Sequence, residues 1–569
     1  MNHSINSDPI FPVESCGRDG DPDPHSRGCP TGESPPEGRP RPPDPTPRGE
    51  TSADTVIPPA NSQDHPRESP AAEPPVPGAG SGHGDDQEKE TVAQTLLRIA
   101  SRARLLRGID GRFYASVPEG DRAECHELRS SRFGRWLTRA YRQEGNQILY
   151  PDLIRRVVGL LEAEAEQAGA LETAYLRVGG GDTGSTGRST YYLDLGDRSR
   201  RAIAIGPGCW RLVDRPSVHF RRPDGFAALP TPSRDGSVDL LRKYTNITDA
   251  EFPLLVAWLT AALRPVGPYP VLNLVGEQGS AKSTLARVAR LLIDPHASPL
   301  RAEPESRRDL MVGALNNWLL AFDNLSALPS WLSDGLCRLA TGGAFAARKL
   351  YDDDQEHHFS AQRPVILNGI SELPRRGDLI DRSLFLNLPP IPNSQRQYEE
   401  DLWAAFQADA PRLLGGLLDA VAGGLRLLPE IQLASRPRMA DFARWGEAVA
   451  QARGQAPGTF LQAYLLNRCL ASMTAVDDSP VARGVIELVA RLGSWTGPAS
   501  ELLVLLRELI RDPLADAKRW PKSPIWLSEQ LRRAAPQLRT CGVIVTFLRR
   551  RAGREIRIER DKLTVTAPS

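Results

Sequence analysis

The chain has 569 residues, a formal net charge of +1 and 25% charged residues. This length is too great for one hydrophobic core and predicts two to four domains of about 150 residues each. Seven scattered cysteines without a C-x-x-C pair argue against a disulfide framework and a zinc module, so we expect a cytoplasmic protein. The longest apolar run, PLLVAWLTAAL, has about half of the ~20 residues that a membrane helix needs, which argues against a membrane protein.

Residues 1–90 are the first predicted segment. They contain 19 of the 50 prolines and carry 7 basic and 17 acidic side chains. Such a stretch cannot bury enough apolar surface to offset its ordering entropy, so we expect a disordered, Pro/Gly-rich acidic tail. The remaining chain carries 64 basic and 53 acidic side chains. This basic body is compatible with a DNA partner, single- or double-stranded, although ordinary solvation explains it equally well.

Residues 91–235 are predicted to form an N-terminal α+β module. Apolar residues recur at intervals of three and four over 91–170, which predicts helices. Over 172–230 the period changes to two, with GGGDTGSTG and GPG as turns, which predicts strands. Asp194 and Asp197 are three residues apart and would face opposite sides of a strand. We therefore expect solvated residues at a strand end rather than a catalytic pair.

The stretch VLNLVGEQGSAKSTLARVAR, residues 271–290, predicts a strand, a tight loop and a helix. It follows the phosphate-binding pattern G-x-x-x-x-G-K-[ST] except that Ala281 replaces the second glycine. In such a loop the backbone N–H groups bind phosphates, the lysine adds a charge and the Ser hydroxyl ligates Mg²⁺. The position of Ala281 leads into the helix, where a methyl group costs little if its φ is negative. The alternative is a glycine-rich turn with a surface lysine.

Lysine is rare in this chain, with 7 lysines against 64 arginines, so a lysine at the required position rarely occurs by chance. The pattern therefore predicts ATP and Mg²⁺ as cofactors. The expected nucleotide-binding residues are Gly276, Glu277, Gln278, Gly279, Ser280, Ala281, Lys282, Ser283 and Thr284.

Further polar residues follow buried strands downstream. In NNWLLAFDNLS a strand ends at Asp323, which is where a carboxylate would hold a magnesium-bound water. The alternative, a cap for the next helix, is better served by Ser326. In RPVILNGI a strand ends at Asn368, which either orients an attacking water or shapes the turn with Gly369. Three arginines precede the next strand, in RRGDLIDRSLFLNLP: Arg375, Arg376 and Arg382.

Residues 238–395 alternate strand-like and helical runs, the pattern of an α/β domain. Residues 396–495 are predicted to be helical. Residues 496–569 contain the helix SPIWLSEQLRRAAPQLR and two strands joined at RRRAG, an order that matches a winged helix. Its wing would span 543–560 and carry Arg549, Arg550 and Arg551 at the turn, where they could meet DNA phosphates. A winged helix that contacts only protein is the alternative.

The order of these motifs resembles the AAA+-type superfamily 3 helicase domain found in phage, plasmid and integrative-element replication proteins, often fused to primases. The resemblance covers about 240–395 and implies a P-loop AAA+-like ATPase core at 238–395. Its catalytic set would be Lys282, Asp323, Asn368 and Arg382. By this resemblance, Ser283 and Asp323 of this chain would hold Mg²⁺. Asn368 would be the sensor residue, and Arg382 would reach the nucleotide site of the neighbouring subunit. Arg376 is the second candidate for that last role.

The family carries a basic hairpin that grips DNA in the pore of a hexameric ring, and TGGAFAARKLYDDDQEHHF occupies its place here. Arg348 and Lys349 would contact DNA, although the hairpin tip is acidic. A second departure is Asn324, which cannot act as a base where many such ATPases have an acid. Candidate replacements are Glu303, Glu305 and Glu372.

The resemblance thus implies an ATP-driven, homo-hexameric DNA helicase or translocase for mobile-element replication, with a separate primase as a candidate partner. The alternative is a DNA-bound regulatory or loader ATPase without processive unwinding.

Overall fold

The computed structural model of the chain describes ten ranges from residue 90 onward. They are 90–108, 110–120, 122–145, 149–180, 190–349, 352–369, 376–477, 479–509, 520–550 and 553–561. Within them, the side chains of 344–349, 352–360, 475 and 550 are left out. The tail predicted for residues 1–90 lies outside these ranges except for its last residue. None of the described helices is both long and apolar enough to cross a membrane.

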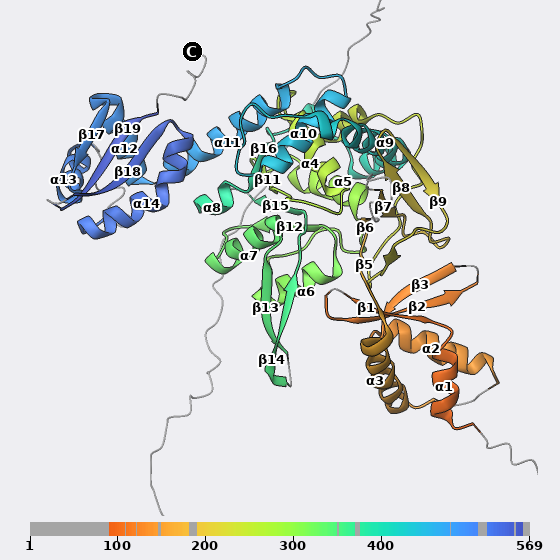
Figure 1. Cartoon of the computed structure of the whole chain (residues 1–569). Helices are drawn as coiled ribbons and strands as arrows, with labels where there is room; N and C mark the ends of the chain where they lie inside the picture. Colours follow the sequence, from red (N-terminus) through yellow and green to blue (C-terminus); the bar gives the residue numbers. More distant parts are fainter. Residues whose placement is uncertain are drawn as a thin grey trace, which may run out of the picture. The chain divides into compact units, whose positions relative to one another are not determined.

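The N-terminal segment forms a four-stranded sheet with three helices (Figure 1). Its strand order is β3-β2-β1-β4, with β1 and β4 parallel and the other pairs antiparallel. Phe133, Leu137 and Leu161 pack in its core. The elements are α1 (Val92–Ala100), β1 (Arg104–Gly108), β2 (Phe113–Glu119), β3 (Arg122–Glu127), α2 (Ser131–Gln143), α3 (Pro151–Ala168) and β4 (Ala170–Glu172).

The helical prediction for 91–170 is therefore wrong over 104–127. Gly111 and Gly120 adopt positive φ between the strands, which breaks a helix and allows tight turns. Phe113, Tyr114 and Val117 favour the pleated conformation between those turns. The helical spacing of the flanking segments does not continue through this stretch.

A small antiparallel sheet follows, as the period of two predicted. Its order is β6-β7-β8-β9, while β5 and β10 pair separately and in parallel. Asp194 differs from its predicted exposed position: it is only 1% exposed and pairs with Arg222 at 2.6 Å. The strands are β5 (Ala174–Tyr175), β6 (Val178–Gly180), β7 (Tyr191–Asp194), β8 (Ala202–Gly206), β9 (Cys209–Val213) and β10 (His219–Phe220).

The next segment contains a four-stranded parallel sheet of order β12-β15-β11-β16, as its alternating pattern predicted. The strands are mostly buried apolar runs. This is expected for a parallel sheet, since helices cover both of its faces. They are β11 (Val271–Val275), β12 (Leu320–Leu325), β15 (Val365–Gly369) and β16 (Ser383–Asn387). The helices are η1 (Val238–Tyr244), α4 (Phe252–Ala262), α5 (Lys282–Ile293), α6 (Arg307–Asn316), α7 (Ser330–Thr341) and α8 (Gly377–Ile380).

A two-stranded antiparallel hairpin interrupts this alternation at the expected place. It consists of β13 (Ala344–Lys349) and β14 (Asp352–Ser360), and it extends away from the parallel sheet in Figure 1.

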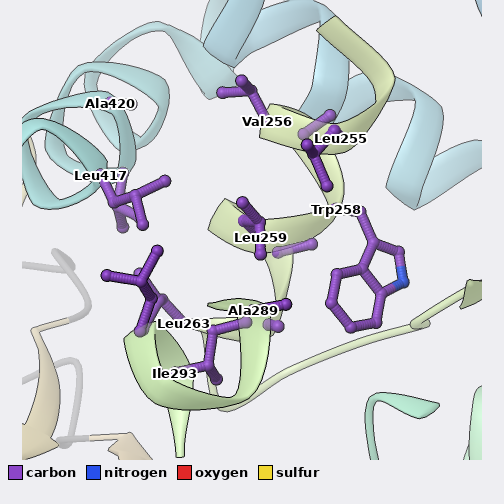
Figure 2. Close-up of a cluster of buried hydrophobic side chains, with 14 of the residues drawn as sticks. Leu255, Val256, Trp258, Leu259, Leu263, Ala289, Ile293, Leu417 and Ala420 are labelled. Carbon is purple, nitrogen blue, oxygen red and sulfur yellow. The ribbon is translucent and has the colours of Figure 1, made fainter. Parts of the chain in front are cut away.

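The helical region begins with η2 (Asn393–Gln395) and continues with α9 (Glu399–Leu427), η3 (Leu428–Glu430), α10 (Ala440–Ala452) and α11 (Thr459–Asp477). Helix α9 shares one core with α4 and α5, which joins this region to the parallel sheet. Figure 2 shows side chains from the three helices in contact, among them Leu259, Ile293 and Leu417.

The last described elements form a helical cluster on a three-stranded antiparallel sheet of order β17-β19-β18. Val485, Leu502, Leu527 and Ile558 belong to its core. The elements are α12 (Pro480–Leu492), β17 (Ser494–Gly497), α13 (Ala499–Leu509), α14 (Pro524–Thr540), β18 (Val543–Arg550) and β19 (Gly553–Arg560).

Candidate functional site

The loop between β11 and α5 is shaped by its close approach to a neighbouring segment. A Cβ atom on Gly276 would collide with the carbonyl oxygen of Leu388 and would come within 2.7 Å of Ser280 Oγ. Ser280 is fully buried. Gly279 has a φ of +80°, which glycine adopts without a Cβ penalty. The exposed rim of the loop consists of Glu277, Gln278 and Gly279, and Thr284 lies half-buried in the first turn of α5.

Ala281 does not have the negative φ at which a methyl group would cost little. It is the N-cap of α5 with φ +60° and ψ +26°, in the left-handed region. The chain must reverse there between the loop and the helix, and a Cβ atom in this region costs about 1–2 kcal/mol. Glycine is usual at this position because it adopts the left-handed conformation without that cost. Alanine therefore occupies a strained position in this chain.

Lys282 is buried rather than a surface lysine, with 9% of its area exposed. Its Nζ donates to the carbonyl oxygens of Gly276 and Glu277, both at 2.7 Å, and to Ser280 Oγ at 3.3 Å. Burial lowers the pKa of Lys282, and the charge of Asp323 opposes that effect. Among the described residues no carboxylate forms an ion pair with this ammonium group, so no counter-ion neutralises its charge there.

Three predicted residues from separate segments meet at the carboxyl edge of the parallel sheet. Ser283 Oγ, on α5, donates to Asp323 Oδ1 at 2.9 Å. Asn368 Nδ2, near the end of β15, donates to Ser283 Oγ at 2.9 Å and also to Asp323 Oδ1. Asn368 is 3% exposed, so its amide is fixed by these contacts. Its side chain therefore contacts residues outside the turn that it forms with Gly369.

Asp323 does not cap the following helix, and neither does Ser326. Helix α7 begins at Ser330 with Pro329 at its N-cap and has no side-chain cap. The prediction that Ser326 would cap this helix is wrong, because the loop of residues 326–329 delays the helix start.

Asn324 occupies a bulge at the end of β12. Its φ is +56°, and the pairing of β12 with β15 shifts register between Phe322 and Leu325. Asparagine is among the residues that tolerate this conformation. Along the outer edge of β12, Arg301 forms a parallel bridge with Phe322. Glu303 follows two residues later in the same direction, which favours it among the candidate bases.

Of the other two candidate bases, only Glu305 lies within the described residues. Glu305 lies further along the same exposed segment. Glu372 lies outside the described residues.

Arg382 lies at the amino end of the parallel strands, whereas the three residues that meet lie at their carboxyl end. It precedes β16, and its carbonyl oxygen accepts from Val271 N at the amino end of β11. Strand β11 separates it from the loop by about 13 Å, given the rise of a strand. Arg382 Nη1 donates to the backbone oxygen of Asp378 at 2.7 Å, and its buried Nε has no partner among the described residues. No described carboxylate pairs with it.

Arg376 is exposed and pairs with Asp334 at 2.9 Å. Arg375 lies outside the described residues.

The predicted DNA-binding residues are only partly described. Arg348 and Lys349 lie at the end of β13, without described side chains. Arg549 is exposed on β18, opposite Arg554 of β19. The side chain of Arg550 and the whole of Arg551 lie outside the described part.

Arg396, which was not predicted from the sequence, lies beside the loop at Gly279. It belongs to no motif, and only the folded chain brings it there.

The fold and the site define an α/β protein in which a glycine-containing loop and three polar residues gather at one edge of a parallel sheet. Residues 238–469 match the family described as "Actinomycete integrative conjugative element replication protein", and residues 481–568 match "AICE RepA C-terminal domain". The two matches together span more than half of the chain. The chain therefore belongs to the replication proteins of actinomycete integrative conjugative elements.

None of the curated proteins matches the chain by sequence. Among solved structures, it is similar to three structures of the NrS-1 C-terminal region, with sequence identities of 10%, 10% and 11% and TM-scores of 0.38, 0.35 and 0.36. The matches cover 83%, 82% and 84% of this chain and 100%, 98% and 100% of those chains.

Proposed function

We propose that this replication protein is an ATP-dependent DNA helicase or translocase that works as a homo-hexameric ring. The observation that carries the proposal is the convergence of Ser283, Asp323 and Asn368 beside the loop that holds Lys282. A buried ammonium group and a strand-to-helix loop at the start of α5 suit the phosphates of ATP. Helicase activity and the ring go beyond the family assignment.

The residues present fit a magnesium ion. Ser283 Oγ and Asp323 Oδ1 are oxygen ligands, which Mg²⁺ prefers, and they lie 2.9 Å apart. Among the described residues, no group of three or more His, Cys, Asp or Glu side chains could hold a metal, so the remaining ligands would be water and phosphate oxygens. Bound there, Mg²⁺ would neutralise charge on the transferred phosphoryl group. Asn368 would hold the hydroxyl and the carboxylate in place.

The position of Arg382 supports the ring. Its guanidinium lies at the sheet edge opposite the loop of its own subunit, so it could meet a γ-phosphate only in a neighbouring subunit. Hydrolysis would then depend on assembly.

Two elements are proposed to contact DNA. The β13–β14 hairpin carries Arg348 and Lys349. The C-terminal order of α12, β17, α13, α14, β18 and β19 with a β17-β19-β18 sheet agrees with a winged helix, whose wing would be the β18–β19 hairpin. A separate primase remains a candidate partner for replication.

A DNA-bound regulatory or loader ATPase is the second candidate. Asn324 favours it, because a side-chain amide at this position cannot take a proton from water. Slow hydrolysis without processive unwinding would follow if no other carboxylate takes the role.

The proposal is tested by measuring ATP hydrolysis and strand displacement on a forked duplex with the purified full chain. We expect hydrolysis that DNA stimulates, together with displacement, and we expect Lys282→Ala to lose both while its circular dichroism spectrum stays that of the folded wild type. Stimulated hydrolysis without displacement would select the regulatory ATPase. A wild-type chain that neither binds nor hydrolyses ATP would refute both.

A further inference from the structure

The segment after β16 runs along the loop between β11 and α5. Leu388 N donates to Val275 O at 2.8 Å, and Ile391 N donates to Gly279 O at 3.4 Å. The Leu388 carbonyl oxygen also fills the space where a Cβ atom of Gly276 would be. These contacts hold residues 388–391 against the loop and direct the chain that follows across its rim.

Arg396 lies on this rim. Its Nη2 atom is 2.9 Å from the position that a Cβ atom on Gly279 would occupy, so the guanidinium contacts the top of the loop. The side chain is exposed, and within the described part of the chain it forms no hydrogen bond or ion pair. By contrast, nearby Arg287 pairs with Glu399 at 2.9 Å. Arg396 therefore brings an unneutralised positive charge to the loop.

An unpaired arginine beside a loop suited to phosphate has a clear chemical use. A nucleotide polyphosphate carries several negative charges, and Lys282 supplies only one positive charge from the loop. A guanidinium group binds phosphate through two parallel N–H donors, and charge-assisted hydrogen bonds of this kind are among the strongest in proteins. Its exposure leaves Arg396 free to turn towards a bound ligand.

We propose that Arg396 binds a phosphate group of the nucleotide held by the loop of its own subunit. This inference rests on the proposed function, since it needs ATP in that loop. Its role is distinct from that of Arg382, which lies at the other edge of the sheet and would serve a neighbour. Arg396 precedes α9, and α9 packs against α5 and α4 (Figure 2). Nucleotide binding would thereby fix the start of the helical region against the loop.

The test measures the equilibrium binding of Mg²⁺-ATP and Mg²⁺-ADP to the full chain. Binding is monitored with a fluorescent nucleotide analogue and, independently, by the rise in melting temperature that the nucleotide causes. We expect Arg396→Ala to weaken ATP binding by about 10- to 100-fold, the range for a hydrogen bond to a charged group. Arg396→Lys should recover part of the loss because it keeps the charge. The matched control is Arg436→Ala, an exposed arginine between α9 and α10, which should bind ATP as the wild type does.

Arg396→Ala should keep the wild-type melting temperature without nucleotide, because its side chain is exposed and unpaired. If this variant binds ATP as tightly as the wild type, the assignment of Arg396 is overturned while the proposed ATPase stands. If the wild type itself binds no ATP, the proposed function fails and the inference fails with it.

Discussion

The residue with the most unusual backbone in the candidate site is Ala281. The sequence pattern alone suggests that alanine is harmless there, because the pattern carries no information on φ. The structure places this residue in the left-handed region at the N-cap of α5. Glycine is the usual residue for such a turn since it lacks the Cβ that clashes.

We therefore expect Ala281→Gly to raise the free energy of unfolding by about 1 kcal/mol, which is the strain that it removes. Chemical denaturation of the full chain measures the change. The control is Ala286→Gly in the interior of α5, where glycine should lower the free energy of unfolding by about 1 kcal/mol or more. A loss of stability in Ala281→Gly would show that the left-handed conformation is not strained.

At the scale of elements, the sequence was most informative where periodicity is strong. The strands of the parallel sheet and the β18–β19 hairpin follow from their apolar runs and turns. Strands β1 to β3 were missed because they lie between two segments with helical periodicity. Asp194 was expected in solvent, because no sequence pattern pairs it with Arg222, 28 residues away. Arg396 and the strain at Ala281 depend on tertiary contacts, which spacing does not encode.

A buried charge network joins the small antiparallel sheet to the end of α5. Asp294 accepts from Arg177 Nε at 3.0 Å and from Arg290 Nη1 at 2.9 Å, and all three side chains are almost fully buried. Burial alone would raise the pKa of Asp294, but the charges of Arg290 and Arg177 outweigh it and lower the pKa. Its contribution to stability is therefore present above the usual pKa of aspartate, about 3.9, and is lost as pH falls through the lower, folded value.

Removing this carboxylate leaves two buried arginines without their counter-ion. We expect Asp294→Ala to lower the free energy of unfolding by about 3–5 kcal/mol, measured by chemical denaturation near neutral pH. Asp249→Ala is the matched control. Asp249 pairs with Arg242 on the surface, with 91% of its side chain exposed, so the change should stay within about 0.5 kcal/mol. Equal effects of the two variants would contradict the structural role of the network.

The β18–β19 hairpin is one of the two elements proposed to contact DNA, and its arginines would meet the phosphates. Replacing Arg549, Arg550 and Arg551 together by Ala in the full chain should weaken binding to duplexes of any sequence to a similar degree. The slope of log affinity against log salt should become shallower by about 1–3. Fluorescence anisotropy over a salt series measures both. Unchanged affinity and slope would assign this module to protein contacts.

At the scale of the whole molecule, the proposed ATP hydrolysis depends on how subunits combine. Ser283, Asp323 and Asn368 meet at one edge of the parallel sheet, whereas Arg382 lies at the other. If Arg382 serves a neighbour, an isolated subunit has an incomplete site. Arg382→Ala should then bind ATP almost normally and hydrolyse it poorly. Arg376→Ala needs the same measurement in parallel, since Arg376 precedes the same strand.

The most direct measurement is the ATP turnover of mixtures of Arg382→Ala and Lys282→Ala subunits at fixed total protein and saturating DNA. Each variant alone should be nearly inactive, one for lack of the arginine and the other for lack of nucleotide binding. A mixed assembly contains interfaces that pair an intact loop with an intact arginine, so we predict partial recovery of activity with a maximum at intermediate ratios. No recovery at any ratio, or a wild-type protein that is monomeric and fully active at every concentration, would contradict the ring.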